Sequence, residues 1–541
     1  MNRMDKLIVD VKLYGETVGS LMWNEKKEWA EFQFYPDYVS KGLDVAPIVM
    51  PLKSRDKDFV YTFPSNRNEC FKGLPGLIAD SLPDKYGNQI IDEWFAANGV
   101  AVSRITPLDR LCYVGNRAMG GLEFVPATNI NGLDESTVLR MDALVSLADK
   151  VYRDRQSFRD CIIREDKTIL DILRIGTSAG GAKPKAIIAL DEKTNEVRSG
   201  QVKAPEGFTY WLLKFDGTTF NENGYKIEHP KGISNIEYTY YRMAKDCGIR
   251  MNECRLLQEG DSFHFMTKRF DRKDNGDKIH MQTLAALAHY DRDTRHSYEE
   301  GFQVIRKLNL GYRDMEEFFR RMVFNIISRN HDDHTKNHSF LMDEKGRWSL
   351  APAYDLCYSY SPTGRWTSIH QMSVNGKQDD FEWKDLAEVA ARMDIKDPDS
   401  IIGKTVDVVS RWSDYALDCG VHPSHSTLIN QNLRLLGKPL VPLKTTKSDN
   451  SIIHNSKSNG STAAITDSQI IPSAGDKWKI RCRIDGVQQL GKLLDKQDKN
   501  RWNILLKVGT EEEQNEFKNW MAEKYYANEL KEKEIDKGMK R

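Results

Sequence analysis

Three polar residues in one short stretch of the chain have the types and spacing that phosphoryl transfer requires. Asp332 is followed five residues later by Asn337, and Asp355 lies 18 residues beyond Asn337. In enzymes that use Mg-ATP, a first Asp accepts the proton of the attacking hydroxyl, whereas an Asn and a later Asp hold the metal. The spacing therefore predicts that Asp332 is a catalytic acid/base and that Asn337 and Asp355 are magnesium ligands.

Residues nearer the N-terminus could supply the nucleotide half of such a site. The turn of small residues at 175–185 precedes an apolar strand-like run, and its backbone N–H groups, hydroxyls and lysines could approach phosphate oxygens. It lacks the G-x-x-x-x-G-K-[ST] pattern of a Walker loop. The expected strand 209–215 carries Lys214 and the following helix carries Glu237, which fits a lysine–glutamate pair that orients phosphates. The candidate nucleotide contacts in the turn are Ser178, Gly180, Gly181, Ala182 and Lys185.

The histidines around Asp332 leave a metal-dependent hydrolase open as an alternative. His331, His334 and His338 could share one face of a helix at a spacing suitable for metal ligands, and a His-Asp pair is typical of metal phosphohydrolases. Against this, Lys336 inside the cluster would repel a cation, and a hydrolase would leave the upstream turn and its lysine unexplained. We expect His334 to hydrogen-bond and orient the catalytic turn instead.

Composition indicates an intracellular protein that does not bind membranes. The 541 residues are enough for roughly two to four domains with sizeable cores. The 79 basic residues balance 79 acidic ones, so nothing global attracts nucleic acid or an anionic membrane. Eight cysteines without a C-x-x-C pair suit a reducing cytosol. Residues 1–15 lack the apolar core of a signal peptide, and no apolar run approaches the ~20 residues of a membrane span. We therefore expect a cytoplasmic location.

The order of alternating and helical segments predicts an α+β protein with a kinase-like, two-lobed fold. Alternating apolar residues mark strands at 7–13, 18–23 and 29–35 in a β-rich N-terminal domain over 1–130. Within that domain the glycine-punctuated segment 113–124 is expected to form a pair of strands.

Three further regions and a linker are expected after this domain. Residues 131–275 should form an N-lobe with the glycine turn and the strand lysine, and residues 276–443 a mainly helical C-lobe with the catalytic motif. A site between these lobes would be typical. A composition rich in Ser, Asn, Thr and Lys predicts a flexible linker over 444–476. Strand signals and a charged helix predict a small α/β C-terminal module over 477–541.

Together these features resemble the HipA-type serine/threonine kinases, which are toxins of bacterial type II toxin–antitoxin systems. The resemblance covers about residues 5–440. It rests on a D-x-H-x-K-N core ending at Asn337 and an A-P-x-Y-D motif ending at Asp355. It also rests on an S-x-x-G-x-x-x-K loop at 178–185, an R-F-D-R motif at 269–272 and the run 372–377.

The resemblance implies roles for residues of the catalytic core and of the strand. Asp332 would be the catalytic acid/base, and Asn337 and Asp355 would bind magnesium. Lys214 would contact the nucleotide phosphates, and Lys336 is a further candidate contact with the nucleotide.

It also implies an adenine site and a regulatory serine. Met266, Lys268 and Phe270 would lie at the adenine, and Ser178 matches the loop serine that such kinases autophosphorylate to switch themselves off. New negative charge where the ATP phosphates bind would repel them. Ser178, like Thr177, could instead only hydrogen-bond phosphate.

The resemblance finally implies partners and outcomes. The protein substrate would belong to the translation machinery, typified by aminoacyl-tRNA synthetases, and phosphorylation would lead to growth arrest or persistence. A helix-turn-helix antitoxin of the HipB type would bring the pair to operator DNA, which the neutral chain alone should bind weakly. The alternative is an inactive scaffold that binds the antitoxin or acts as a co-repressor. The retained Asp332, Asn337 and Asp355 argue against it.

Overall fold

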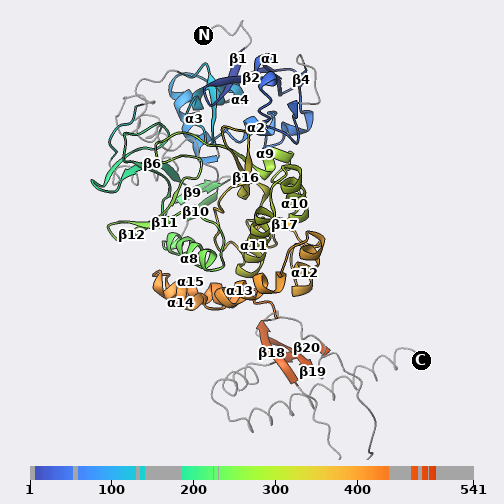
Figure 1. The fold of residues 1–541 in the computed structure, drawn as a ribbon. Helices are drawn as coiled ribbons and strands as arrows, with labels where there is room; N and C mark the ends of the chain where they lie inside the picture. Colours follow the sequence, from blue (N-terminus) through green and yellow to red (C-terminus); the bar gives the residue numbers. More distant parts are fainter. Residues whose placement is uncertain are drawn as a thin grey trace, which may run out of the picture. The chain divides into compact units, whose positions relative to one another are not determined.

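The computed structural model of the chain divides into two compact units, Met1–Val441 and Pro442–Arg541 (Figure 1). In the first unit the structure describes residues 7–52, 59–83, 85–128, 135–139, 173, 184–217, 219–222, 225–228 and 231–437. In the second unit it describes three strands, β18 (Ile465–Pro472), β19 (Trp478–Ile484) and β20 (Val487–Leu494), which form one antiparallel sheet. Strand β18 falls within the segment 444–476 that was predicted to be a flexible linker, so this part of the linker forms a strand instead. The rest of that segment and the predicted charged helix lie outside the described residues.

The N-terminal part of the first unit is built on a five-stranded antiparallel sheet with strand order β4-β3-β2-β1-β5. Alternate residues of its strands, such as Val9 and Val11, are fully buried, because one face of the sheet packs on the core. The predicted strands are therefore present, and four helices lie between β3 and β5 in the chain. The strands are β1 (Ile8–Leu13), β2 (Glu16–Asn24), β3 (Trp29–Phe34), β4 (Val60–Tyr61) and β5 (Leu122–Val125), and the helices are α1 (Pro36–Lys41), α2 (Gly76–Ala79), α3 (Lys85–Ala97) and α4 (Pro107–Val114).

The predicted pair of strands at 113–124 is wrong in its first half. Helix α4 runs through Val114, and only β5 is extended. The helix begins in a capping box, in which the hydroxyl of Thr106 accepts from the N–H of Asp109 and the Asp109 carboxylate accepts from the N–H of Thr106. Pro107 at the first helical position strengthens this start. These signals lie upstream of the glycines that suggested strands.

A second five-stranded antiparallel sheet, order β11-β12-β8-β6-β7, carries the strand lysine. Trp211 and Leu213 alternate onto its apolar face, where they pack with Met266 and Ala186. Helix α8 (Ile233–Asp246) packs against β12 and β11. The strands are β6 (Lys185–Asp191), β7 (Glu196–Ser199), β8 (Thr209–Lys214), β11 (Cys254–Glu259) and β12 (Ser262–Lys268), and the hairpin β9 (Thr219–Glu222) and β10 (Tyr225–Glu228) follows β8.

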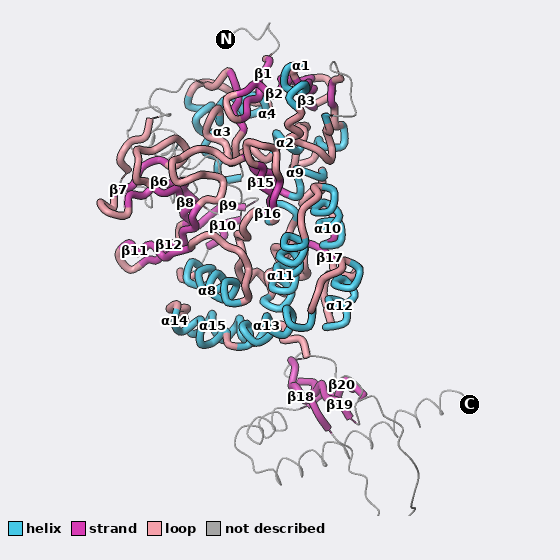
Figure 2. Tube along the Cα trace, in the orientation of Figure 1, coloured by secondary structure: helices cyan, strands magenta, loops and turns pink. Residues whose placement is uncertain are grey.

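The C-terminal part of the unit is mainly helical (Figure 2). It is arranged around α11 (Tyr312–Ser328), 12 of whose 17 residues are buried. Phe318, Met322 and Ile326 of α11 lie in the largest apolar cluster of the described chain. The other helices are α9 (Leu284–Ala288), α10 (Tyr298–Lys307), α12 (Trp383–Arg392), α13 (Pro398–Ser410), α14 (Trp412–Asp418) and α15 (Pro423–Asn432). Short strands accompany them: β13 (His280–Thr283), β15 (Ser339–Met342) and β16 (Trp348–Leu350) in one sheet, and β14 (His296–Ser297) with β17 (Met372–Ser373) in another. The predicted α+β class, with a β-rich N-terminal part and a helical C-terminal part, is confirmed.

The N-terminal sheet and the helical part share polar contacts and core. The hydroxyl of Tyr14 donates to the carbonyl of Met342 at 2.6 Å and accepts from the N–H of His280 at 2.9 Å. Met342 and Ala285 lie within the apolar core of the N-terminal sheet. The sheet is therefore packed directly on the region that carries the catalytic motif.

Two arginines and a buried carboxylate join the second sheet to the N-terminal part. Asp271 accepts from Arg269 at 2.6 Å, from Arg272 at 2.9 Å and from the N–H of Gly120 at 2.7 Å, and all three side chains are buried. Burial alone would raise the pKa of Asp271, but the two guanidinium groups lower it well below its usual range. The R-F-D-R motif thus connects the second sheet to the loop before β5.

No helix in the described part of the chain is both long enough and apolar enough to cross a membrane.

We predict that acid destabilises this packing. His280 is fully buried, and burial lowers its pKa from 6.5 to about 3. Because the unfolded chain binds the proton more readily, the stability that neutral His280 contributes is complete above pH 6.5. It is lost as the pH falls toward the folded-state value, at about 1.4 kcal/mol per pH unit. His289 should act in the same direction, since burial lowers its pKa to about 4.

Urea denaturation followed between pH 7.5 and pH 5 measures this dependence. The variant His280→Gln cannot be protonated there, so its free energy of unfolding should fall less steeply with acid than that of the wild type. An equal slope in the two proteins would contradict the prediction.

Candidate active site

The side chain of Lys214 joins two carboxylates from distant parts of the chain. Its Nζ lies 2.5 Å from Oε1 of Glu237 on α8, and it also donates to Oδ1 of Asp355. Glu237 is buried, whereas the Asp355 side chain is 40% exposed. The structure therefore brings together three residues that the sequence selected separately, with only the outer carboxylate open to solvent.

The charge on Lys214 is secured by these partners. Burial by itself lowers the pKa of the ammonium, but Asp355 and Glu237 together raise it above its usual value. The residue therefore remains a cation at neutral pH despite being enclosed.

Asp216 fixes the position of Glu237. It lies two residues after Lys214, and its carboxylate accepts from the N–H of Gly232 at 2.8 Å and from the N–H of Ser234 at 3.2 Å. These N–H groups belong to the first turn of α8, which has no cap of its own from the residue that precedes it. The strand that presents Lys214 thus also anchors the helix that presents Glu237.

The segment ending at Asp355 is bonded on each side. The carbonyl of Ala351 accepts from buried Arg321 at 2.7 Å, and the N–H of Ala353 donates to the carbonyl of Arg250 at 2.7 Å. The hydroxyl of Tyr354 donates to the carbonyl of Lys336 at 2.6 Å. Asp355 itself has φ +56°, a left-handed conformation that is uncommon for residues other than glycine and is often found at functional positions.

The catalytic motif forms a non-helical turn after α11. Arg329 ends that helix with φ +62°, and a single 3₁₀ turn, η4 (Thr335–Asn337), follows. The side-chain amide of Asn337 donates to the carbonyl of Asp332 at 2.7 Å, which orients its oxygen as the remaining ligand atom. The carboxyl group of Asp332 is 49% exposed. Asp332 and Asn337 are therefore held together, and the acid is accessible.

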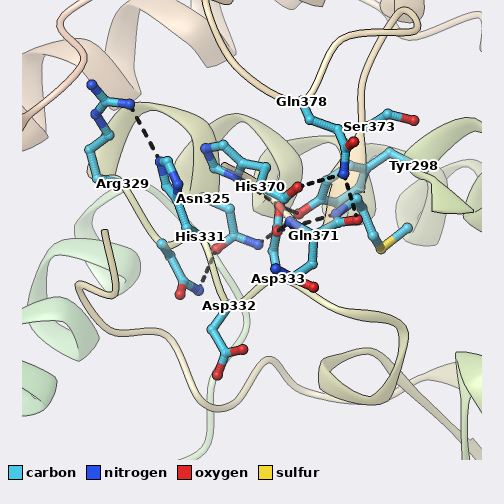
Figure 3. A network of polar contacts seen from close by, with 12 residues as sticks. Tyr298, Asn325, Arg329, His331, Asp332, Asp333, His370, Gln371, Ser373 and Gln378 are labelled. Carbon is cyan, nitrogen blue, oxygen red and sulfur yellow. Dashed lines mark hydrogen bonds and ion pairs between the residues drawn. The ribbon is translucent and has the colours of Figure 1, made fainter. Parts of the chain in front are cut away.

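Asp333 has the opposite environment, although it is the next residue. Its side chain is fully buried and accepts from the hydroxyl of Tyr298 at 2.9 Å and from the N–H groups of Gln371 at 2.8 Å and Met372 at 3.4 Å (Figure 3). Nδ1 of His370 lies 2.9 Å from Oδ2. Burial lowers the pKa of His370, so the neutral ring donates its one proton to this carboxylate.

The network continues through α11 to the backbone of Asp332. Tyr298 accepts from Asn325 at 2.9 Å, and Asn325 accepts from Asn330 at 3.0 Å (Figure 3). The hydroxyl of Ser359 donates to Asn330 at 3.1 Å and accepts from the N–H of Asp332 at 2.9 Å. Both sides of the turn are thus tied to the segment that follows Asp355.

The helical face proposed for the three histidines does not exist, because the helix ends before His331. His331 is buried with its ring 4.0 Å from that of His370, and burial is the main cause of a pKa lowered to about 2. His334 lies near the predicted acid/base, with Nε2 at 3.8 Å from Oδ1 of Asp332. His338 is enclosed by aromatic rings. Among the described residues, no three His, Cys, Asp or Glu side chains are grouped to hold a metal.

The remaining predicted contacts lie in different places. Lys185 is paired directly with Lys214 across β6 and β8, so both side chains are on one face of the sheet. Met266 is buried in the apolar core of the sheet, and Lys268 forms an exposed ion pair with Asp274.

Of two more predicted nucleotide contacts, Phe270 lies beside the catalytic motif and Lys336 lies within it. The ring of Phe270 contacts Tyr354, the neighbour of Asp355, at 5.5 Å. Lys336 donates to the carbonyl of Cys70 in the N-terminal part at 3.4 Å. The glycine turn, with Ser178, Gly180, Gly181 and Ala182, lies outside the described residues.

Sequence reasoning missed three residues that position the site. Asp216 has no local capping signal, because the helix it caps begins at Ile233, 17 residues later. Asp333 does not have the spacing to Asn337 that selects Asp332, so its role could be found only from its contacts. Tyr354 lies inside the A-P-x-Y-D motif, and its fixed place there is the one signal that could have identified it.

Comparisons with protein families and solved structures agree with this geometry. The family described as the HipA-like C-terminal domain matches residues 177–412, and the one described as the HipA N-terminal domain matches residues 9–125. The chain is a HipA-like protein. The resemblance inferred from its motifs is thereby confirmed.

Two curated relatives of this HipA-like chain carry kinase names. "Putative kinase Y4dM" of Sinorhizobium fredii is 30% identical over 222 residues, which are 38% of this chain and 51% of the relative. A "Putative kinase" of Haemophilus influenzae is 27% identical over 145 residues, which are 24% of this chain and 42% of the relative. The chain thus spans about half the length of the curated relatives it matches.

Among solved structures, the HipA-like chain resembles one from a toxin–antitoxin complex of HipA, HipB and operator DNA from Shewanella oneidensis. The TM-score is 0.52 at 15% identity, and the alignment covers 78% of this chain and 94% of that chain. This likeness shows a shared fold, and it confirms the predicted fold class.

We predict that Asp333→Asn destabilises the protein by about 2–4 kcal/mol, because it removes a buried charge that accepts from several donors. The neighbouring Asp332→Asn is the matched control, since its side chain is half exposed, and it should change stability by about 0.5 kcal/mol or less. Urea denaturation monitored by tryptophan fluorescence measures both values. Equal effects of the two substitutions would show that the buried network is not what holds the turn.

Proposed function

We propose that the chain is a Mg-ATP-dependent serine/threonine protein kinase of the HipA toxin type. The observation that carries the proposal is the shared ion pair of Lys214 with Glu237 and Asp355. A lysine held this way by a helix glutamate suits the binding of nucleotide phosphates, and a partly exposed Asp beside it suits metal bound to those phosphates. The kinase names of the two relatives agree with this assignment.

The donor set fits magnesium. Mg²⁺ prefers oxygen ligands and usually combines one or two carboxylates with substrate phosphates. Asp355 offers a carboxylate, and Asn337 offers an amide oxygen because its nitrogen is already donated to Asp332. Asp355 follows Tyr354 in the chain, and Asn337 follows Lys336. The hydroxyl of Tyr354 donates to the carbonyl of Lys336, which ties the two ligands to each other. When bound, the metal would neutralise charge on the phosphates.

Asp332 is the proposed acid/base. Its exposed carboxylate would accept the proton of a serine or threonine hydroxyl as the hydroxyl oxygen bonds to the γ-phosphorus and the bond to ADP breaks. His334, 3.8 Å from Asp332, would orient this carboxylate. Lys214 would hold the phosphates in line through its fixed ammonium.

The finer assignments follow the same proposal. Ser178 would be the autophosphorylation site, and Ser178, Gly180, Gly181, Ala182 and Lys185 would contact the nucleotide phosphates. The protein substrate would be a component of translation, such as an aminoacyl-tRNA synthetase. The Shewanella structure is a complex of HipA with HipB and its operator DNA, which supports a helix-turn-helix antitoxin as the partner through which DNA is reached.

We predict that the wild-type chain becomes phosphorylated when it is incubated with labelled ATP and magnesium. Asp332→Asn should lower the rate of this labelling about a hundredfold or more. Lys214→Met should weaken ATP binding about tenfold or more, because one charged contact with the phosphates is lost. Lys273→Met is the matched control, since this exposed lysine is paired with Glu344 and is not among the proposed nucleotide contacts, and it should bind ATP normally. Chelating the magnesium should stop the transfer.

The outcomes separate the alternatives. Absence of both nucleotide binding and label in the wild type would support the scaffold instead of the kinase. Label that persists in Ser178→Ala would remove only the autophosphorylation site from the proposal. Stoichiometric zinc or iron bound through His331 and His334 would revive the hydrolase.

A further inference from the structure

The segment after Asp355 forms a loop with both ends bonded to the catalytic turn. At its first end, Ser359 accepts from the N–H of Asp332 at 2.9 Å. At its second end, the N–H of Gln371 donates to Asp333 at 2.8 Å. The loop between them, residues 360–370, therefore begins and ends beside the proposed catalytic acid.

Internal hydrogen bonds give this loop a defined shape. The N–H of Ser361 donates to the carbonyl of Thr367 at 3.2 Å, and the N–H of Ser368 donates to the carbonyl of Gly364 at 3.1 Å. The side chain of Gln371 donates to the carbonyl of Trp366. Trp366 is thus connected through one residue, Gln371, to the carboxylate of Asp333.

Two large apolar side chains of the loop are exposed. Trp366 is 45% exposed and Ile369 is 44% exposed, and they are the only exposed large apolar side chains among residues 313–416, a stretch that the structure describes throughout. The guanidinium of Arg365 lies over the Trp366 ring at 4.9 Å. Exposed tryptophan and arginine are the residue types that most often dominate binding to another protein.

The loop's position and charge restrict what can bind it. Trp366 is five residues from Gln371, so its Cα lies within about 17 Å of that residue, the span of about five extended residues. Residues 356–371 include Arg365 and no Asp or Glu, so this segment is weakly basic. A polypeptide that presents a hydroxyl to Asp332 would therefore reach the loop within a few residues.

We propose that Trp366 and Ile369 bind an apolar side chain of the protein substrate, close in sequence to the serine or threonine that is phosphorylated. This inference rests on the proposed kinase activity and specifies how that activity selects its substrate. The occupant is an extended peptide segment with an aliphatic or aromatic residue within about five positions of the hydroxyl. Arg365 would favour a segment without nearby basic residues.

The test uses the full-length chain, labelled Mg-ATP and a library of serine peptides in which each flanking position is varied. The wild type should label peptides with a large apolar residue near the serine in preference to the others. The double variant Trp366→Ser/Ile369→Ser should lose that preference and lower kcat/KM on the best peptide about tenfold or more, while its Kd for ATP stays unchanged. Leu417→Ser is the matched control, because Leu417 is 81% exposed on α14, and it should leave peptide labelling as in the wild type.

Several results would overturn the inference without affecting the proposed activity. These are a wild type that labels itself but no peptide, peptides labelled without an apolar preference, or a double variant as active on peptides as the wild type. A change of oligomeric state in the double variant would assign the surface to a second copy of the chain. Failure of the proposed function is distinct, since the wild type would then neither bind Mg-ATP nor label itself or any peptide.

Discussion

The architecture of the site depends on one enclosed ammonium shared by two carboxylates. Removing a charge from water costs several kcal/mol, so Lys214 is stable in its position only while both Glu237 and Asp355 lie against it. Those partners come from a helix and from a segment 141 residues away, and both must be placed accurately. Two carboxylates against one cation also leave the trio with a net negative charge. Such a trio suits a divalent cation better than it suits a bare anion.

Hydrogen bonds made by Asp216 and Tyr354 keep the two carboxylates in place. Because Asp216 follows Lys214 by two residues and caps α8, any shift of the strand moves the helix with it. Tyr354 does the same for Asp355, its neighbour in the chain, because its hydroxyl donates to the carbonyl of Lys336, the residue before Asn337. The positions of Glu237 and Asp355 thus depend on hydrogen bonds to backbone groups and not only on their ion pairs with Lys214.

Two adjacent aspartates divide the work of the catalytic turn. Asp332 is half exposed, and within the described part of the chain its carboxylate has only the 3.8 Å contact with His334. Asp333 is fully buried and bonded to two backbone N–H groups, a tyrosine and a neutral histidine. Loss of a buried acceptor leaves its donors unsatisfied, which is why the buried aspartate fixes the turn more strongly than the exposed one. The loop carrying Trp366 is attached to both residues, so the position of a bound peptide would be set by the same network that sets the acid.

Much of this arrangement could be predicted from the sequence, and the failures have a common cause. Alternation located β1 to β3, and spacing selected Lys214, Glu237 and Asp355, which do meet. The strand pair at 113–124 and the helical face of the histidines were wrong, because a capping box and a left-handed Arg329 decided those segments. Asp216, Asp333 and Tyr354 act through partners that are distant in the sequence, and no local pattern encodes such partners. The Ser178 turn stays a prediction.

A buried ionic cluster joins the β-rich N-terminal part to the second sheet. Asp271 holds Arg269, Arg272 and the N–H of Gly120 in a fully buried cluster, and a buried ion pair contributes little net stability because its desolvation cost is high. What such a cluster supplies is a single geometry, since any other arrangement would leave a charge unpaired. Arg269, Asp271 and Arg272 belong to the R-F-D-R motif through which the chain resembles its family. Lys336 also donates to the N-terminal part, at the carbonyl of Cys70. The N-terminal part is therefore joined to the second sheet through Asp271 and to the turn that carries Asp332 through Lys336.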